Sequence, residues 1–406
     1  ANRVVISNCC SQLIYEGELI MKKIVVLTAT RAEYGLLAPV IKKMDMDSQI
    51  DVRVVVTGAH LSPEFGMTIN EIKEDGVRVD KEIDILLSSD TPAAISKTMG
   101  LAMIGFADYF AESKPDALMV LGDRYETLAV CAAAMNAQIP IVHLYGGEAT
   151  EGLIDEAVRN AITKLSYLHF TSTEEYRHRV IQMGENPQRV YTAGAIGVEN
   201  ALHTNFMSKQ ELEKSLECSL GEKIAVLTFH PVTLEHNTAE IQIGELIKAI
   251  KHYPEITFIC TKANADMSGR IINDSLQKCA ETQKNIILFD SLGLKIYLSL
   301  LSYAEFVIGN SSSGIIEVPS FKIPTINIGD RQKGRTQARS VINCIPKADN
   351  IIEAISTALS EEFKNSICNI VNPYGDGNAS EVIVNVTKEF LLNNKLKIQK
   401  SFYDIT

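Results

Sequence analysis

Residues 304–318 read AEFVIGNSSSGIIEV, and this stretch decides the fold class. An apolar run at its start is typical of a buried strand, and apolar residues at helical spacing follow it. The junction between strand and helix holds two glycines around three serines: Gly309, Gly314, Ser311, Ser312 and Ser313. Backbone N–H groups and hydroxyls at such a junction bind anions, so the stretch predicts a phosphate site. Glu317 lies one turn further on, within reach of ribose hydroxyls if the anion is a nucleotide.

The same alternation of short β-branched runs and longer amphipathic stretches continues along the chain from Met21. Candidate strands in the first half are 24–28, 52–56, 117–121, 139–143 and 168–171, separated by helical patterns at 36–44, 91–113, 127–136, 154–165 and 173–183. In the second half they are 224–228, 256–260, 286–289, 306–309 and 325–328, with helices such as 239–251 and 351–359. Strand followed by helix, repeated, indicates parallel sheets covered on both faces. The sequence therefore predicts an α/β protein of two Rossmann-like, doubly wound domains that face each other across a cleft.

Domain boundaries follow from breaks in this pattern. We expect an N-terminal extension over 1–20, a first domain over 21–198, a second over 199–380, and a C-terminal helix and tail over 381–406. The glycine-containing segment 193–205 is the expected hinge. The C-terminal helix is amphipathic, and we expect it to pack back on the first domain.

Composition excludes several classes of protein. The chain has 406 residues, 46% of them apolar, and a formal net charge of −11. It has no basic stripe to displace counterions from nucleic acid, and no apolar run long enough for a membrane span. Its eight cysteines form no C-x-x-C pair, which favours reduced thiols over zinc ligands or disulfides. We expect a cytoplasmic protein that binds neither nucleic acid nor membranes.

Two clusters follow strands of the first half. TATRAEYGLL at 28–37 places Arg31 at a helix entrance, where a guanidinium and backbone N–H groups can bind phosphate, although a capped helix with a solvated arginine explains it equally well. No G-x-G-x-x-G motif accompanies it, so the nicotinamide fingerprint is absent. GDRYETLA at 122–129 places Asp123 beside Arg124, a cation that would support its ionisation, although a helix-capping aspartate is the plainer interpretation.

The densest cluster is HLYGGEATEGLIDEAVRNAITKL at 143–165. It combines a strand-terminal His143 and a glycine pair with four acids and a base: Glu148, Glu151, Asp155, Glu156 and Arg159. Complementing a helix dipole explains one or two of these acids. Crowded carboxylates in a cleft raise some carboxyl pKa values, as a general acid or base near neutral pH requires. We therefore expect catalysis here, together with Asp123.

In the second half, basic and polar residues again follow strands. His230 precedes a proline after one strand, and NIGDRQKGR at 327–335 supplies Arg331, Lys333 and Arg335 after another. These groups share one sheet edge with the three serines. The anion they predict is most simply a nucleotide diphosphate.

Seven of these stretches, in order, resemble one enzyme family: TRAEYGLL, LGDRYETLA, GGEATEGLIDEAVRNAITKL, HPVT, GNSSSGIIEV, INIGDRQKGR and YGDGNAS. From Met21 to about Phe390 the sequence resembles the hydrolysing UDP-N-acetylglucosamine 2-epimerases. The resemblance implies a GT-B-like fold, elimination of UDP to 2-acetamidoglucal, and hydration to N-acetylmannosamine for sialic acid synthesis. It also implies no cofactor, no metal, and a homodimer or homotetramer.

The resemblance carries roles onto particular residues. It implies an acid/base set of Asp123, Glu148, Asp155 and Glu156, with Arg124 and His230 beside them. It implies contacts to the sugar nucleotide from Arg31, Tyr145, Arg159, Ser311, Ser312, Ser313, Gly314, Glu317, Arg331 and Arg335, with Glu317 as the ribose partner.

Tyr145 departs from the family pattern, because relatives carry glutamate or histidine immediately before the glycine pair. A tyrosine is a poor base at pH 7, so the base must be one of the nearby carboxylates. The change also fits another sugar, such as the UDP- or GDP-linked 2,4-diacetamido-2,4,6-trideoxyhexose of the legionaminic acid route. A GT-B glycosyltransferase and a non-catalytic sugar-nucleotide sensor remain the alternatives.

Overall fold

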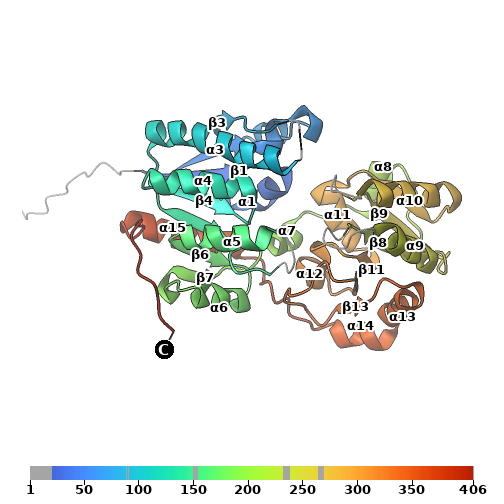
Figure 1. Ribbon diagram of the computed structural model, residues 1–406. Helices are drawn as coiled ribbons and strands as arrows, with labels where there is room; N and C mark the ends of the chain where they lie inside the picture. The colour runs from blue at the N-terminus through green and yellow to red at the C-terminus, as the bar shows by residue number, and fades with distance from the viewer. Residues whose placement is uncertain are drawn as a thin grey trace, which may run out of the picture.

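The computed structural model describes residues 21–87, 89, 91–149, 154–231, 238–263 and 269–405. Over these residues the chain forms two parallel sheets with helices packed against them, arranged side by side (Figure 1). The predicted fold class, two doubly wound α/β domains, is confirmed. The expected extension 1–20 lies outside the described residues.

The first sheet has seven strands in the order β3-β2-β1-β4-β5-β6-β7. They are β1 Lys22–Thr28, β2 Ile50–Thr57, β3 Val79–Ile83, β4 Ala117–Leu121, β5 Ile141–Leu144, β6 Leu168–Thr171 and β7 Val190–Thr192. The helices are α1 Arg31–Asp45, α2 Ile69–Glu74, α3 Pro92–Ser113, α4 Tyr125–Asn136, α5 Ile154–Leu165, α6 Glu174–Gln182 and α7 Ile196–His203, with short 3-10 turns η1 Gly58–Leu61, η2 Pro63–Phe65 and η3 Pro187–Arg189. The strand order reverses between β1 and β4, which is where such sheets open a ligand crevice.

The second sheet has six strands in the order β10-β9-β8-β11-β12-β13. They are β8 Lys223–Thr228, β9 Ile256–Thr261, β10 Ile286–Phe289, β11 Ala304–Gly309, β12 Thr325–Ile328 and β13 Val341–Cys344. The helices are α8 Lys209–Leu216, α9 Ala239–Ile250, α10 Gly269–Thr282, α11 Gly293–Leu301, α12 Ser313–Ile316, α13 Ala348–Leu359 and α14 Glu361–Ile367, with the 3-10 turn η4 Val318–Phe321. Here the order reverses between β8 and β11, directly before His230 and the serines.

Each sheet is buried on both faces, which explains the apolar strands. Successive residues of a strand point to opposite faces, so Ile24 and Val26 belong to one apolar cluster and Val25 and Leu27 to another. The second sheet repeats this arrangement with Ala225 on one face and Val226 on the other. The two sheets therefore hold the loops at their carboxyl edges on rigid supports.

The last helix, α15 (Ala379–Leu392), follows the second domain in the chain but packs against α1 of the first (Figure 1). Its Ile383, Val384, Phe390 and Leu391 join the apolar cluster that contains β1. The tail beyond it stays on the same domain. Lys400 lies 2.7 Å from the fully buried carboxylate of Glu185, and the N–H of Tyr403 donates to the carbonyl of Gly184 (2.9 Å).

Three features differ from expectation. The segment 193–205, expected as a hinge, contains α7, whose Ile196 and Val198 are fully buried. The helix expected after the three serines lasts one turn, because Pro319 follows and the chain continues as a 3-10 turn. Strands β3, β7 and β13 were not predicted. No helix within the described ranges is long and apolar enough to cross a membrane.

Candidate active site

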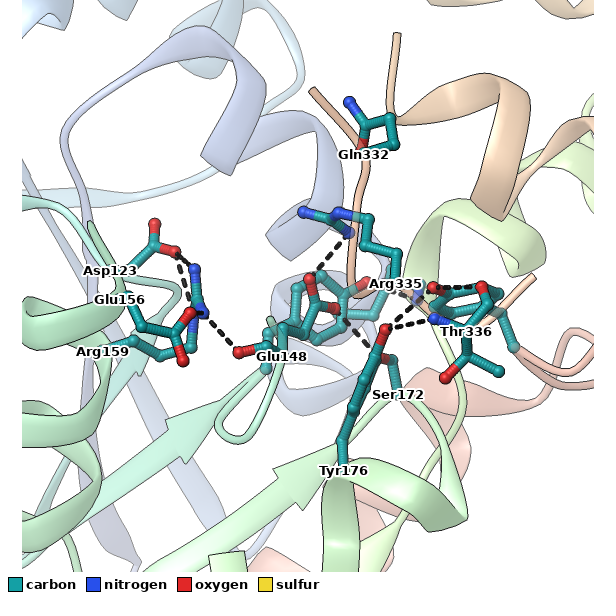
Figure 2. Close-up of polar contacts among 12 residues, drawn as sticks. Asp123, Glu148, Glu156, Arg159, Ser172, Tyr176, Gln332, Arg335 and Thr336 are labelled. Atoms are coloured by element: carbon teal, nitrogen blue, oxygen red, sulfur yellow. Dashed lines mark hydrogen bonds and ion pairs between the residues drawn. The ribbon is translucent and has the colours of Figure 1, made fainter. Parts of the chain in front are cut away.

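Asp123 lies just beyond β4 and is bound by Arg159 of α5. Arg159 Nε donates to Asp123 Oδ2 (3.0 Å), Nη2 contacts the same oxygen, and Nη1 lies 2.9 Å from Glu156 Oε2. The Arg159 side chain is 1% exposed, whereas Asp123 and Glu156 are 29% and 38% exposed. A buried guanidinium therefore positions two carboxylates that solvent, or a ligand, can reach (Figure 2).

The support that Asp123 was expected to receive from Arg124 is not found. Arg124 occupies the N-cap position of α4 with extended backbone angles, and its Nε donates to Glu126 Oε1 (2.5 Å). Glu126 is 1% exposed and belongs to α4, so its burial draws Arg124 away from Asp123. The capping interpretation of Asp123 is also wrong, because Arg124 and not Asp123 is the cap residue.

The glycine pair positions Glu148. Gly147 has a positive φ of 78°, and a Cβ at this position would overlap the carbonyl oxygen of Tyr176, so only glycine fits. The chain then turns Glu148 inward, where it is 7% exposed. Its Oε1 accepts from the Ser172 hydroxyl and its Oε2 from Arg335 Nη1, both at 2.9 Å. Both carboxylate oxygens are therefore already bound.

His143, the last residue but one of β5, supports the loop that carries Asp123. Its Nε2 donates to the carbonyl of Gly122 (2.8 Å), and its Nδ1 accepts from the Thr163 hydroxyl (3.2 Å). Burial lowers the pKa of His143 to about 3, so the ring stays neutral. Its position explains why a histidine stands near the end of this strand.

Tyr145 adopts a left-handed backbone, with φ of 69°, directly before the glycine pair. Its hydroxyl oxygen accepts from the N–H of Ile196 at the start of α7 (2.7 Å). Burial raises the pKa of Tyr145 far above its usual value, with Glu148 and Glu317 contributing in the same direction. Tyr145 thus presents a neutral hydroxyl between acids of both domains.

The helix entrance after β1 has the predicted cap. Thr30 and Glu33 form a capping box, and the Glu33 carboxylate also accepts from the N–H of Ala29 (2.7 Å). Burial raises the pKa of Glu33 to about 7. Sequence reasoning passed over Glu33, although a glutamate three residues after a threonine is the usual signal. Arg31 points to Glu71, 3.0 Å away, and is half exposed.

In the second domain, Asn310 organises the predicted anion site, a role that no sequence pattern indicated. Its Oδ1 accepts from the N–H of His230 (2.7 Å) and its Nδ2 donates to the carbonyl of His230 (2.8 Å). The main-chain carbonyl of Asn310 accepts from Arg331 Nη1 (3.0 Å) and Gln332 Nε2 (2.9 Å). One buried asparagine therefore joins the loops after β8, β11 and β12.

Residues 309–317 are here called the anion loop. Together with His230 they lie along this edge. Burial lowers the pKa of His230 to about 4, and Arg331 acts in the same direction, so the imidazole is neutral. Gly309 has φ of 136°, and a Cβ there would overlap the carbonyl oxygen of Thr228. The Ser313 hydroxyl lies 2.7 Å from the Tyr297 hydroxyl, and Gly314 packs against Thr325.

Glu317 lies at the end of α12, and its Oε2 has no hydrogen-bond partner among the described residues. Burial raises the pKa of the Glu317 carboxyl to about 7, although the Ser313 hydroxyl opposes the shift. Its Oε1 points at Gly197 of α7, where any side chain would overlap it. The Glu317 carboxyl is therefore partly protonated near neutral pH, and its Oε2 can bond to a polar group of a ligand.

Most of the predicted site residues gather at the facing sheet edges. Asp155 lies in the first turn of α5 and is half-buried, Glu156 follows it, and Ser311 and Ser312 precede α12. Arg335 reaches across to Glu148 of the first domain. Arg124 and Arg31 are engaged by acids of their own domain. Glu151 lies outside the described residues.

Comparison with known proteins gives concordant results. The family model described as UDP-N-acetylglucosamine 2-epimerase matches residues 42–388. The chain is 42% identical, over 85% of its length and 89% of the relative's, to GDP/UDP-N,N'-diacetylbacillosamine 2-epimerase (hydrolyzing) of Campylobacter jejuni. It is 40% identical, over 95% of its length and 98% of the relative's, to polysialic acid biosynthesis protein P7 of Escherichia coli.

A solved structure shares the fold. UDP-GlcNAc 2-epimerase from Neisseria meningitidis, bound to UDP-GlcNAc, aligns with a TM-score of 0.77 at 22% identity, over 90% of this chain and 100% of that one. The family match covers most of the chain, and the two relatives are 42% and 40% identical to it over most of their lengths. This chain belongs to the UDP-N-acetylglucosamine 2-epimerase family.

Proposed function

We propose that this protein is a hydrolysing 2-epimerase that converts UDP-N-acetylglucosamine and water to N-acetylmannosamine and UDP. One observation carries the proposal: an edge on which Asn310 holds His230 and Arg331 faces an edge on which Arg159 positions Asp123. Arg335, bonded to Glu148, brings the two edges together. The hydrolysing 2-epimerase from Campylobacter supports the reaction type.

The second domain supplies the groups that bind the leaving diphosphate. As the C1–O bond breaks, both electrons leave with the UDP oxygen, and negative charge grows on the diphosphate. The anion loop, His230 and Arg331 are already fixed by Asn310, so they need no reorganisation to stabilise that charge.

The first domain supplies the proton transfers. Asp123 takes a proton from C2 while the C1–O bond breaks. The electron pair of the C2–H bond forms the C1–C2 double bond of 2-acetamidoglucal. One Asp123 oxygen is bound by Arg159 and the other points away from it (Figure 2). Positive charge building at C1 makes the C2 hydrogen acidic enough for a carboxylate to remove.

Hydration completes the reaction. The oxygen of water bonds to C1 and one proton of that water passes to a carboxylate, while a carboxyl group gives a proton to C2 on the face opposite the one that lost a proton in the first step. The product is N-acetylmannosamine. Asp155 and Glu156, in the first turn of α5, are the carboxyl groups for this second transfer. Glu148 is not among them, because its two oxygens are bound by Ser172 and Arg335.

Turnover in deuterium oxide tests the reaction. Purified protein and UDP-N-acetylglucosamine, without any acceptor, should yield free N-acetylmannosamine carrying deuterium at C2, read by NMR. Intact substrate, or a product without deuterium at C2, overturns elimination. A glycosyltransferase would need an acceptor and would leave C2 untouched.

A second substrate has its own support. Tyr145 presents a hydroxyl where an acid or histidine was expected, and the 42% identical relative carries diacetylbacillosamine in its name. The same reaction on a UDP- or GDP-linked 2,4-diacetamido-2,4,6-trideoxyhexose is therefore the second candidate. A substrate panel with and without the 4-acetamido and 6-deoxy groups separates the two. Higher kcat/KM for the diacetamido sugar would reassign the substrate and keep the reaction.

A further inference from the structure

Glu148 and Arg335 join the two domains through a nearly buried ion pair. Glu148 follows β5 of the first domain and Arg335 follows β12 of the second, 187 residues apart. Arg335 Nη1 lies 2.9 Å from Glu148 Oε2, and the two side chains are 12% and 8% exposed. Burial alone would lower the pKa of Arg335, but Glu148 together with Tyr374, Tyr176 and Asp123 raises it above its usual value. Each charge therefore depends on the other domain for its counter-charge.

The next residue, Thr336, makes a second set of contacts to the first domain. Its N–H donates to the Tyr176 hydroxyl (3.0 Å), and its own hydroxyl donates to Glu175 (2.6 Å), both on α6. Its carbonyl accepts from the hydroxyl of Tyr374 (3.0 Å). Figure 2 shows Tyr176 and Thr336 beside the Arg335–Glu148 pair. We call this set the interdomain latch: Glu148, Tyr176, Arg335, Thr336 and Tyr374.

The interdomain latch is connected to the proposed base. The main-chain carbonyl of Glu148 accepts from Arg159 Nη1, and the same guanidinium binds Asp123. At its other end, the loop that carries Arg335 begins with Arg331, which donates to the carbonyl of Asn310 under the anion loop. A loop of five residues thus contacts both the anion site and the residue whose backbone positions Arg159.

We propose that the interdomain latch, through its Glu148–Arg335 pair, couples capture of the leaving diphosphate to the orientation of Asp123. In this assignment, which rests on the proposed function, both are positioning residues and neither touches the sugar. The two partners come from different domains, so the pair exists only while the domains lie together, and removing one partner leaves the other nearly buried without a counter-charge. Diphosphate bound at the anion loop holds this loop in place through Asn310 and Arg331, the loop keeps Arg335 at Glu148, and the main chain of Glu148 keeps Arg159 on Asp123.

Domain closure can be measured without turnover. We compare Glu148→Gln, Arg335→Gln and their double variant with Arg339→Gln, which changes an exposed arginine four residues further along the same loop. Small-angle X-ray scattering with saturating UDP should show wild type and the control equally compact, and the three latch variants expanded. Unchanged scattering from the latch variants would overturn the latch.

Kinetics separate a latch from an acid or base. Latch loss should lower kcat by about 10²-fold through misplacement of Asp123, with UDP affinity within about threefold of wild type. The double variant should be no slower than the single variants, because both remove one interaction. If Glu148 exchanged protons with the substrate, its substitution would erase one limb of the kcat–pH profile whatever stands at 335, and that result would refute the assignment.

Tyr176→Phe provides a milder test should the charge variants fail to fold. It removes only the hydroxyl that accepts from Thr336, and should lower kcat about fivefold with partial expansion in scattering. Equality with the Arg339→Gln control in both measurements counts against the latch. Scattering and UDP binding do not need catalysis, so a failure of the latch is distinguishable from a failure of the epimerase proposal, which the C2 deuterium experiment decides on wild type.

Discussion

On the first sheet, the loops after β4 and β5 carry charges that are already paired, whereas the loops after β8 and β11 on the second sheet carry mainly neutral groups. Asp123 has Arg159 and Glu148 has Arg335. On the second sheet, His230 Nδ1 and Glu317 Oε2 are buried without a partner in the part of the chain that the structure describes. Two edges of the same architecture thus differ in how complete they are without a ligand.

This difference indicates that the first edge suits proton transfer and the second suits ligand binding. A paired carboxylate keeps its charge and its direction, as a base requires, and the arginine beside it fixes the geometry. Neutral donors with an unsatisfied atom gain most when an anion or a hydroxyl arrives, because leaving them unpaired is unfavourable. We therefore expect substitutions on the first edge to change turnover, and those on the second to change binding.

Gly309→Ala should break the second edge most severely. A Cβ would overlap the Thr228 carbonyl at a φ of 136°, so we expect a loss of about 3 kcal/mol in unfolding free energy and loss of UDP binding. Gly35→Ala is the matched control, because its Cβ would meet nothing within 4 Å on α1. Thermal unfolding and calorimetry measure both. Equal stability of the two variants would contradict the argument.

Asp123→Asn tests the first edge. The amide keeps the shape but cannot take a proton, so turnover should fall by about 10²-fold or more while substrate affinity changes little. Steady-state kinetics measure it, with Asp108→Asn on the exposed side of α3 as control. A large rise in KM with unchanged kcat would move Asp123 to the binding edge.

Ser312→Ala should act on binding alone. Loss of one charge-assisted hydrogen bond to the diphosphate should weaken UDP by roughly 1–2 kcal/mol, or about five- to thirtyfold in Kd. Titration calorimetry with UDP measures it directly. Wild-type affinity would remove Ser312 from the anion site.

Glu317→Gln should change how stability depends on pH. The pKa of Glu317 is raised to about 7, so between pH 4.5 and 7 the folded protein keeps a proton that the unfolded chain has lost, and this group lowers stability as pH rises. The glutamine variant should lose less Tm than wild type between pH 5 and 8. About 1 kcal/mol would appear as about 2–4 °C. Glu33, shifted in the same direction, is present in both proteins and cancels. Parallel Tm curves would disprove the burial of this carboxyl.

The sequence predicted the interior of the fold better than its edges. Strand β4 is apolar throughout, β4 and β12 are buried over their whole length, and the bounds of both matched the prediction. The missed strands β3, β7 and β13 all lie at sheet edges, where half-exposed residues break the apolar run, as VDKEI does in β3. A pattern search finds burial, and edge strands offer little of it.

The candidate site shows a similar division. The residue types at strand ends were predictable, because parallel strands bring their carboxyl ends to one edge. Their partners were not. Sequence proximity suggested Arg124 for Asp123, but the partner is Arg159, 36 residues away, since α4 directs Arg124 to Glu126. The contact between Glu148 and Arg335 spans two domains, and the role of Asn310 depends on three loops meeting.

The return of α15 to the first domain has a consequence for biosynthesis. Residues 22–192 leave the ribosome first, yet the cluster around β1 is completed by Ile383, Val384, Phe390 and Leu391. A nascent chain must therefore leave part of this apolar cluster, the part not covered by α1 and α2, exposed while the second domain is translated. We expect a fragment ending at residue 378 to bind a hydrophobic dye and to be cut by protease, and a separate 379–405 peptide added in trans to suppress both.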